Sequence, residues 1–230
     1  MPSFRMMYHY MEYKHWHPAR MWGYLFKQIS FARYDWVRHR TAPTNSYLHA
    51  LRNFMESHKS PGSSYVVTSN ADGMFDQEGF PRETTCLTQG DYSRIQCQSV
   101  WDTKPFMERA LKSFNEETYE IDEEAIPKCP NCGGEMFLLL RMDNTFLESA
   151  MTPGKQAYKK WVNQVLKEVE MNGKKFAILE VGVGFNTPSV LRYPNEDMAT
   201  MEGVSLVRVN SKDPDVPFDS HGVGLAVDAN

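Results

Sequence analysis

The chain has 230 residues, 41% of them hydrophobic, and a net charge of −4 at pH 7. It has no apolar run of about 18 residues and no basic segment leading into an apolar one, so we expect neither a transmembrane helix nor a secretory signal. The negative charge gives no electrostatic support for nucleic-acid binding. The four cysteines form no dense framework, which favours a reducing compartment and an intracellular protein, in the cytoplasm or an organelle.

Basic and aromatic residues are concentrated at the start of the sequence. Residues 1–60 hold nine Lys and Arg against three Asp and Glu, together with six of the seven histidines and 13 of the 29 aromatic residues. The simpler interpretation is a set of aromatic-rich helices with solvated basic edges. The alternative is a basic wall beside an anionic ligand.

The first segment, residues 1–59, is predicted to be helical. Apolar residues such as Trp22 and Phe26 recur near the helical period of 3.6. Pro43, with a threonine before it, suits the start of a further helix. After a loop, "YVVTS" at residues 65–69 is predicted to be a buried strand that ends in the polar turn "NADG".

The rest of the chain is expected to contain strands and one long helix. Residues 98–128 are polar and charged, and we expect them to be irregular. Lys155 to Asn172 forms a predicted amphipathic helix, which Gly173 ends. The predicted strands are "EMFLLLRM" from residue 135, "KFAILEV" from residue 175, "GVSLVRVN" from residue 203 and the tail "GVGLAVDAN" from residue 222.

Apolar strands separated by helices predict an α/β fold: an open, mostly parallel, Rossmann-like sheet flanked by helices. We expect a single domain over residues 1–230 with an insertion at 97–135. Ligands of such sheets bind beyond the carboxyl ends of the strands. A stretch at such an end could therefore be part of a ligand site, or it could be an ordinary strand-to-helix turn. Three such stretches follow predicted strands: "TSNADG" (68–73), "TQGDY" (88–92) and "GVGFNTP" (182–188).

The cysteines suggest a metal site. Cys129 and Cys132 form a C-x-x-C pair, the spacing of half a zinc knuckle, and Cys97 is a plausible third ligand. A structural zinc site has four ligands, and Cys86 is an unconvincing fourth. A redox role is disfavoured because the pair does not open a helix after a strand. The insertion is therefore expected to be a small zinc-ribbon-like subdomain, with zinc bound or absent.

These motifs, taken in their order along the chain, resemble the sirtuin family. "TSNADG", "TQGDY", Cys97 with "CPNC", "GVGFNTPSV" and "VRVN" follow the sirtuin order. The chain is most similar to the class M sirtuins, which occur in microbes beside macrodomain and lipoyl-carrier genes. The resemblance is carried by "LTQGDYSRIQC", "LLLRMDNTF" and "LEVGVGFNTPSVLRYP", and it covers nearly the whole chain.

The resemblance implies an NAD-dependent protein ADP-ribosyltransferase. Such an enzyme would transfer ADP-ribose to a lipoylated carrier protein and release nicotinamide, with a macrodomain protein as a further partner. Gln89 stands where a deacetylating sirtuin has its histidine base, and a glutamine amide cannot accept a proton near pH 7. It can hydrogen-bond ribose hydroxyls. The alternatives are a non-catalytic NAD- or ADP-ribose-binding relic and an NAD-dependent deacylase, the latter disfavoured by Gln89.

The resemblance also implies the roles of individual residues. Asn70, Gln89 and Arg141 would be catalytic, while Asn70 and Gln89 would also contact NAD. From the residues alone, Asn70 could instead be an Asx-turn residue, and Arg141 a structural ion-pair partner. The other implied NAD contacts are Ser69, Asp72, Gly182, Gly184, Asn186, Asn210 and Asp228, and the implied zinc ligands are Cys97, Cys129 and Cys132.

Two departures from the sirtuin pattern are visible. Sirtuins begin with a strand and a G-A-G-x-S loop that cradles the pyrophosphate, whereas this sequence opens with "MPSFRMMYHY". We therefore expect the domain to be incomplete at its N-terminus or degenerate, with weakened NAD affinity. Trp101 stands where the fourth zinc ligand is expected, so the three thiolates would hold the ion weakly or pack as small buried side chains.

Overall fold

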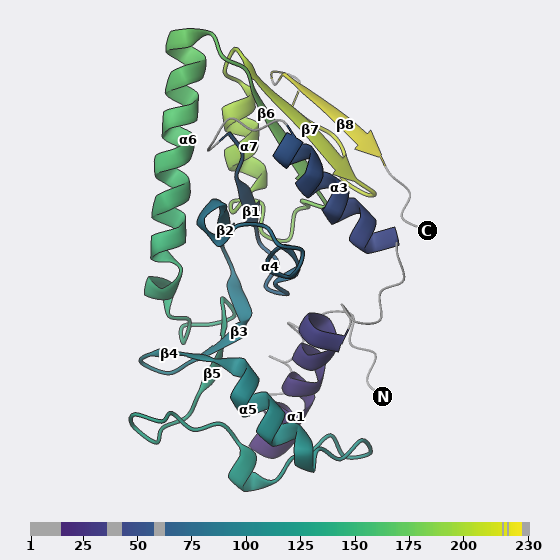
Figure 1. Ribbon diagram of the computed structural model, residues 1–230, viewed down its shortest axis with the longest axis vertical. Helices are drawn as coiled ribbons and strands as arrows, with labels where there is room; N and C mark the ends of the chain where they lie inside the picture. Colours follow the sequence, from purple (N-terminus) through teal and green to yellow (C-terminus); the bar gives the residue numbers. More distant parts are fainter. Residues whose placement is uncertain (1–14, 36–42, 58–62, 218, 220, 227–230) are drawn as a thin grey trace. The chain divides into compact units, whose positions relative to one another are not determined.

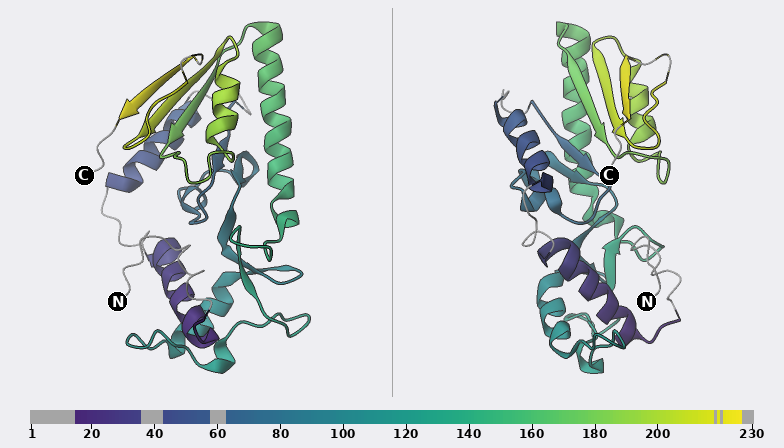
Figure 2. Two further views of the ribbon diagram at one scale, coloured as in Figure 1. Left: turned by 180° about the vertical axis from the view of Figure 1, so that it is seen from behind. Right: turned by 90° about the vertical axis from the view of Figure 1, so that its right-hand side faces the viewer.

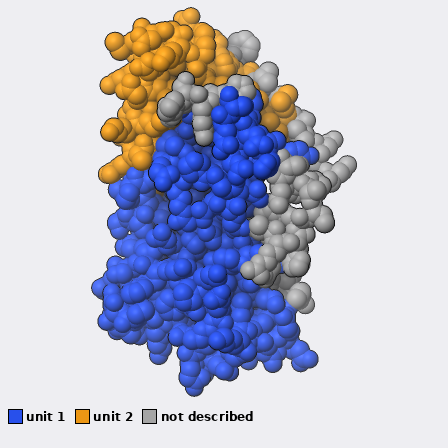
Figure 3. Space-filling view, viewed as in Figure 1, with its two compact units in different colours: residues 1–154 blue, residues 155–230 orange. Residues whose placement is uncertain are grey.

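The computed structural model describes residues 15–35, 43–57, 63–217, 219 and 221–226. The chain divides into two compact units, unit 1 (Met1–Gly154) and unit 2 (Lys155–Asn230) (Figure 3). Within the described residues no helix combines the length and the apolarity needed to cross a membrane.

The helices predicted near the start of the chain are present where the residues are described. Helix α1 (Pro18–Ile29) begins with Pro18, which needs no hydrogen-bond acceptor at this position. The side chains of Trp22 and Phe26 are buried on its inner face, as the periodicity predicts. A π-helical turn (Ser30–Asp35) follows α1. Helix α3 (Pro43–Ser57) starts at the predicted proline.

The strands of unit 1 form two small sheets (Figure 1). Strands β1 and β2 are parallel, with Thr68 paired with Leu87. Strands β4, β3 and β5 form an antiparallel sheet in that order. The predicted insertion at 97–135 begins after β3, includes β4 and ends before β5. The elements of unit 1 after α3 are β1 (Val66–Thr68), α4 (Met74–Gln77), β2 (Thr85–Leu87), β3 (Gly90–Gln96), β4 (Val100–Asp102), α5 (Thr103–Ala110) and β5 (Phe137–Leu140).

The expectation that residues 98–128 are irregular is wrong for their first part, which forms β4 and α5. Asp102 caps α5 by accepting a hydrogen bond from the backbone N–H of Lys104 at 3.0 Å. The helix buries only Thr103, Met107 and Ala110. This apolar stripe is too sparse to show as a pattern among the charged residues around it.

The core of unit 1 is apolar and rich in aromatic side chains. It joins α1, α5, β3 and β5 in one cluster. Its fully or nearly fully buried members include Trp22, Leu25, Phe26, Ile95 and Leu140. Trp101 packs against this cluster from β4, and it lies opposite Ile95 in the β3–β4 ladder.

Unit 2 contains a parallel sheet in the order β6–β7–β8, with all three predicted strands present. Helices α6 and α7 pack on one face of this sheet, where Val169 and Ala199 join Ile178, Val204 and Leu206 in a small apolar core (Figures 1 and 2). The elements are α6 (Thr152–Asn172), β6 (Phe176–Val181), α7 (Arg192–Ala199), β7 (Val204–Asn210) and β8 (Gly222–Ala226).

The protein is therefore of mixed α/β class, with two small parallel sheets and one antiparallel sheet among the described residues. The long helix extends through Asn172, as predicted, but begins three residues before Lys155, at Thr152. Helix α7 was not predicted, because its sequence "RYPNEDMA" has no apolar stripe and contains a proline. A continuous Rossmann-like sheet and a zinc ribbon stay predictions.

Candidate functional site

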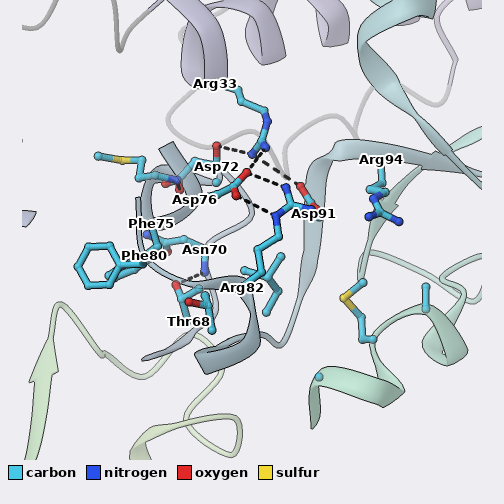
Figure 4. A pocket seen from close by; sticks show the side chains of 17 residues that line it. Arg33, Thr68, Asn70, Asp72, Phe75, Asp76, Phe80, Arg82, Asp91 and Arg94 are labelled. Atoms are coloured by element: carbon cyan, nitrogen blue, oxygen red, sulfur yellow. Dashed lines mark hydrogen bonds and ion pairs between the residues drawn. The ribbon is translucent and has the colours of Figure 1, made fainter. Parts of the chain in front are cut away.

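A pocket of about 270 Å³ lies in unit 1, where β1 and β2 end (Figure 4). We call it the strand-edge pocket. Its apolar wall includes Phe75, Phe80 and Met151. Its polar wall includes Thr68 and Asn70, and its charged side chains are Arg33, Asp72, Asp76, Arg82, Asp91 and Arg94. The two stretches "TSNADG" and "TQGDY" thus meet at one sheet edge, as the sequence predicts.

Backbone contacts hold the loop after β1 against its neighbours. The backbone N–H of Thr88 donates to the carbonyl of Thr68 at 3.0 Å, which joins the ends of β1 and β2. The N–H of Tyr92 donates to the carbonyl of Ala71 at 2.9 Å, which ties the loop to β3. The N–H of Asn70 donates to the hydroxyl of Thr68 at 3.0 Å, so this turn is closed by Thr68 and not by the Asn70 side chain.

Asp72 lies two residues before the short helix α4, whose N-cap is Gly73. The Oδ1 atom of Asp72 accepts a hydrogen bond from the backbone N–H of Met74 at 2.9 Å. Gly73 follows with φ +73°, a backbone conformation that residues other than glycine rarely adopt. The side chain of Asp72 therefore has a fixed position in the pocket wall, while Asn70 is exposed beside it.

Arg33, which comes from the π-helical turn after α1, holds this loop in place. Only 7% of its side chain is exposed. Its guanidinium donates to the carbonyl of Asp72 at 3.3 Å and to Asp76 at 3.0 Å, and it lies 3.8 Å from a carboxylate oxygen of Asp91. A Cβ on Gly73 would lie 1.5 Å from its Nη1, so the glycine makes room for the arginine.

Asp76 is shared between two arginines (Figure 4). Arg82 binds it through two parallel hydrogen bonds of 2.8 and 2.7 Å, the geometry that favours guanidinium–carboxylate pairs. These hydrogen bonds from Arg82 are the main cause that lowers the pKa of Asp76, with a smaller contribution from Arg33. Asp76 is thus a charged structural partner and a poor general base.

Gln89 lies at the sheet edge but outside the strand-edge pocket. Its side chain is 8% exposed, and its Oε1 atom is buried with no hydrogen-bond partner among the described residues. Such an unpaired oxygen costs about 1–3 kcal/mol unless water or a ligand donates to it. Ser69 and Arg141 are also absent from the described residues that line the pocket.

Arg141 is next to Gln89 through the backbone. Its N–H donates to the carbonyl of Gln89 at 2.9 Å. Its side chain is about half exposed, forms an ion pair with Glu148 and lies 5.2 Å from the ring of Phe146. The structural ion pair considered for Arg141 from the sequence is therefore present.

The three predicted zinc ligands are brought together in unit 1. The sulfur atoms of Cys97, Cys129 and Cys132 lie within 4.8 Å of one another, with Cys97 at 2.9 Å from Cys129 and 4.0 Å from Cys132. Sulfur ligands of one tetrahedral zinc would be roughly 3.8 Å apart, so a small opening of the Cys97–Cys129 contact would admit the ion. No fourth cysteine, histidine or carboxylate joins this group among the described residues.

The surroundings of Cys129 favour its thiolate. The hydrogen bond from Cys97 is the main cause that lowers the pKa of Cys129 to about 7, with backbone N–H groups of the knuckle adding to it. The pKa of Cys132 is raised instead, because the N–H of Gly134 lowers it by less than the contacts with Cys129 and Cys97 and burial raise it. The knuckle is closed by the N–H of Gly133, which donates to the carbonyl of Cys129 at 2.8 Å. Cys86 is buried and lies outside the group.

The glycine turn of unit 2 follows β6. Gly182 has φ +69°, and Gly184 and the exposed Asn186 follow it. Asn210, at the end of β7, donates from its side-chain amide to the carbonyl of Val183 at 3.0 Å, and its Oδ1 accepts from two backbone N–H groups. The predicted residues therefore meet at one sheet edge, but the amide of Asn210 is already used by the backbone.

Arg192, from α7, also supports this turn and was not predicted. Its guanidinium donates to the carbonyls of Val183 and Asp213 at 3.2 and 3.1 Å and lies 4.0 Å from the ring centre of Phe185. Asp228, the last predicted cofactor residue, lies outside the described residues.

Sequence reasoning also missed most of the charged side chains in the strand-edge pocket. Arg33 lies in the basic segment 1–60, for which a basic wall beside an anionic ligand was one interpretation. That excess of basic residues was the sequence signal that could have pointed to Arg33. Asp91 belongs to the stretch "TQGDY" but received no role. Arg82 comes from an element with no motif of its own, and Arg94 belongs to the stretch "LTQGDYSRIQC" but received no role.

The chain matches no protein-family model. It is 33% identical over 216 residues to a "Probable bifunctional ADP-ribose hydrolase/ADP-ribosyltransferase" of Fusarium oxysporum f. sp. cubense, a match that covers 89% of this chain and 34% of that protein. It is 26% identical over 179 residues to a "Protein ADP-ribosyltransferase" of Staphylococcus aureus strain Mu50, covering 75% of this chain and 53% of that protein. The matched region thus spans about a third and about half of these two relatives.

Proposed function

We propose that this chain transfers ADP-ribose from NAD to an acceptor protein and releases nicotinamide. The observation that carries the proposal is the strand-edge pocket, whose wall presents Asn70 and Asp72 at the ends of two parallel strands. Open parallel sheets bind nucleotides at this edge. The names of both relatives, which include ADP-ribosyltransferase, support the same class of reaction.

The finer form of the proposal is a transferase of sirtuin type, closest to class M. The order of the motifs from "TSNADG" to "VRVN" supports it. The acceptor would be a lipoyl-bearing carrier protein, and a macrodomain protein would act on the same modification.

NAD supplies an activated ribose whose bond to nicotinamide breaks in the reaction, which leaves positive charge on that ribose. The acceptor forms a new bond to the same carbon and releases its proton. Asp72, whose carboxylate accepts the N–H of Met74 just before α4, would orient this ribose or the carboxamide of nicotinamide, and its charge would favour the positive charge on the ribose. Asn70, exposed beside it in the pocket wall, would contact the nicotinamide ribose and position the reacting carbon.

Gln89 would take part as a hydrogen-bonding group. Its buried Oε1 lacks a donor among the described residues, and a ribose hydroxyl could supply one. Because the amide cannot remove a proton near pH 7, this residue fits transfer to an external acceptor better than deacylation.

The cysteine group would hold zinc as a structural ion. Three thiolates from Cys97, Cys129 and Cys132 fit its preferred donors, and the ion would join the end of β3 to the knuckle. Trp101 packs against the apolar core instead of supplying a fourth ligand.

A non-catalytic NAD-binding relic is the second candidate. It is favoured by the ion pair between Arg141 and Glu148, which occupies a side chain that the transferase would need. The glycine turn of unit 2 would serve NAD binding in either case, through Gly182, Gly184, Asn186 and Asn210.

The two candidates differ in whether nicotinamide is released. The full chain would be incubated with NAD and a lipoylated carrier protein, then with the same carrier lacking the lipoyl group, and the carrier analysed by mass spectrometry. A transferase adds one ADP-ribose mass to the carrier and releases an equal amount of nicotinamide. Asn70→Ala should abolish both products, whereas the exposed Asn163→Ala on α6 should leave them unchanged. Binding of NAD with neither product would favour the relic.

A further inference from the structure

A second pocket of about 270 Å³ lies in unit 1 between the π-helical turn, β3, β4 and the start of α5. We call it the basic pocket. Four of its lining side chains are cationic, and two are aromatic: Arg33, Arg82, Arg94, Lys104, Tyr34 and Trp101. Asp102 is its acidic lining residue. Three arginines, Arg33, Arg82 and Arg94, line the strand-edge pocket as well.

We propose that the basic pocket binds an oxyanion, and that in the reaction it holds an acidic side chain of the acceptor protein. The second part rests on the proposed transferase function. The first part is independent of that function, because it concerns only the charge and the hydrogen-bond donors of this pocket.

Two of the four cations are available for a ligand. Arg33 and Arg82 already bind Asp76. Arg94 has no ion-pair or hydrogen-bond partner among the described residues, and in Figure 4 it stands apart from the cluster around Asp76. Among the described residues, the ammonium of Lys104 has one ion pair, with the exposed Glu108 at 3.7 Å. A guanidinium next to an ammonium is well suited to a carboxylate or a phosphate.

The one carboxylate among the lining residues of the pocket, that of Asp102, offsets only part of the charge of the four cations. Asp102 is used as the cap of α5, where its Oδ1 accepts the backbone N–H of Lys104 at 3.0 Å. The ammonium of Lys104 lies 5.9 Å from the ring centre of Tyr34, a cation–π contact that keeps it at the pocket wall.

One residue that lines the pocket, Trp101, has an unused hydrogen-bond donor. The Nε1 atom of Trp101 is buried and has no hydrogen-bond partner among the described residues. Indole N–H is a donor only, so the partner it lacks is an acceptor such as an oxyanion. Tyr34, which also lines the pocket, adds a second donor, because a tyrosine hydroxyl is protonated at pH 7; burial raises its pKa further.

The shared arginines place the two pockets side by side. An acceptor anchored by an acidic side chain in the basic pocket would bring a neighbouring nucleophile close to the strand-edge pocket, where NAD is proposed to react. A phosphate of NAD is the other ligand that the same arginines could contact. The experiments below distinguish an acidic side chain of the acceptor from this phosphate.

The first experiment measures direct binding to the full chain by NMR. Its readout is the indole N–H signal of Trp101, which is assigned by its absence from the spectrum of Trp101→Phe. The probes are a triglutamate peptide and, separately, inorganic phosphate. The peptide should move this signal in a saturable way. Lys104→Glu should weaken peptide binding by at least about fivefold. This variant puts an acidic residue in the first turn of α5, which the helix dipole favours, so the fold should survive.

The matched control is Lys112→Glu, which makes the same change of charge on an exposed lysine that lines neither pocket. It should bind the peptide as the unchanged chain does. An unmoved Trp101 signal, or equal weakening by both variants, would overturn the oxyanion site. A signal moved by phosphate alone would overturn the assignment to an acceptor side chain.

Kinetics then test the link to the reaction. Lys104→Glu should raise the KM for the acceptor by about fivefold and leave its kcat and the KM for NAD near their original values. A rise in the KM for NAD with an unchanged acceptor KM would assign the basic pocket to a phosphate of NAD. If the unchanged chain releases no nicotinamide, the proposed transferase function fails, while the Trp101 titration still decides whether the basic pocket binds an oxyanion.

Discussion

The two units end their parallel strands in different ways. In unit 1, the edge of β1 and β2 opens into a pocket where Asn70 is exposed and Arg94 has no partner among the described residues. In unit 2, two polar side chains at the corresponding edge already bind the backbone, because Asn210 and Arg192 both donate to the carbonyl of Val183. Polar side chains at a sheet edge are therefore not equally available, and the hydrogen bonds that they already make decide which of them can bind a ligand.

The two units also differ in the kind of side chains that they bury. Unit 1 buries aromatic and aliphatic side chains, such as Trp22 and Phe26. Unit 2 has a smaller apolar core and buries an ion pair, in which the guanidinium of Arg208 binds Glu180 and also Glu196. Arg208 is fully buried and Glu180 is 2% exposed. We infer that the buried charges of unit 2 act on stability, whereas unit 1 has both structural charges, such as Arg33 beside Asp76, and charges that are available for binding, such as Arg94.

The largest effect is expected from Glu180→Ala. The change leaves Arg208 buried with Glu196 as its remaining carboxylate, and removing one member of a buried ion pair costs about 3–5 kcal/mol. Urea unfolding of the full chain measures this loss. Glu170→Ala, on the exposed side of α6, is the control. A loss for Glu180→Ala no larger than that of the control would show that the ion pair contributes nothing to stability.

The second prediction concerns Gly73 and Arg33. Gly73→Ala should destabilise the protein by roughly 2–4 kcal/mol, because it combines an unfavourable positive φ with displacement of the guanidinium that would lie 1.5 Å away. In an Arg33→Ala background the same change should cost about 1 kcal/mol, since only the φ penalty remains. Thermal unfolding of the four proteins gives this cycle. Equal costs in both backgrounds would mean that Arg33 does not occupy the space above Gly73.

A third prediction concerns the cysteine group. Protein purified without chelator should contain about one zinc per chain, and Cys132→Ser should lose it. A chelator should lower the melting temperature of the original chain and leave that of Cys132→Ser unchanged. Ser93→Ala, which removes a side chain outside the group, should retain zinc. Folded protein without zinc would show that the three cysteines pack as ordinary side chains.

The smallest effect is expected from Asp76, whose pKa is lowered by Arg82 and Arg33. A lowered folded-state pKa contributes stability above the ordinary value near 4 and loses it as the pH falls through the folded-state value. Asp76→Asn should therefore be less stable than the original chain by about 0.2–1 kcal/mol at pH 7, because Arg82 is largely exposed. The difference should vanish near pH 2 to 3 in urea unfolding. A difference that grows on acidification would contradict this sign.

The parts of the fold that followed from the sequence are those with a strong local pattern. The periodicity around Trp22 predicted α1, and the apolar runs predicted β6 and β7. Helices α5 and α7 were missed because α5 buries three residues and α7 buries only Arg192 and Ala199. Their positions depend on capping and on contacts with distant residues, which no local pattern contains.

The site residues divide in the same way, into those that a local motif predicted and those that only tertiary packing brings together. Asn70 and Asp72 were predicted from one motif and line the pocket together. Arg33 and Arg82 reach the same pocket from elements separated by about fifty residues, and their meeting at Asp76 depends on tertiary packing. Such a cluster could not be derived from spacing along the chain. The unpaired Oε1 of Gln89 is likewise visible only in the folded structure.

The most direct test of the proposed NAD site is NAD binding by titration calorimetry, with the full chain, Asn70→Ala and the control Asn163→Ala. We predict that the full chain and the control bind with the same affinity, and that Asn70→Ala weakens binding at least about tenfold without a change in melting temperature. Equal affinity in all three proteins, or no binding by the original chain, would contradict the assignment of the strand-edge pocket as the place where NAD reacts.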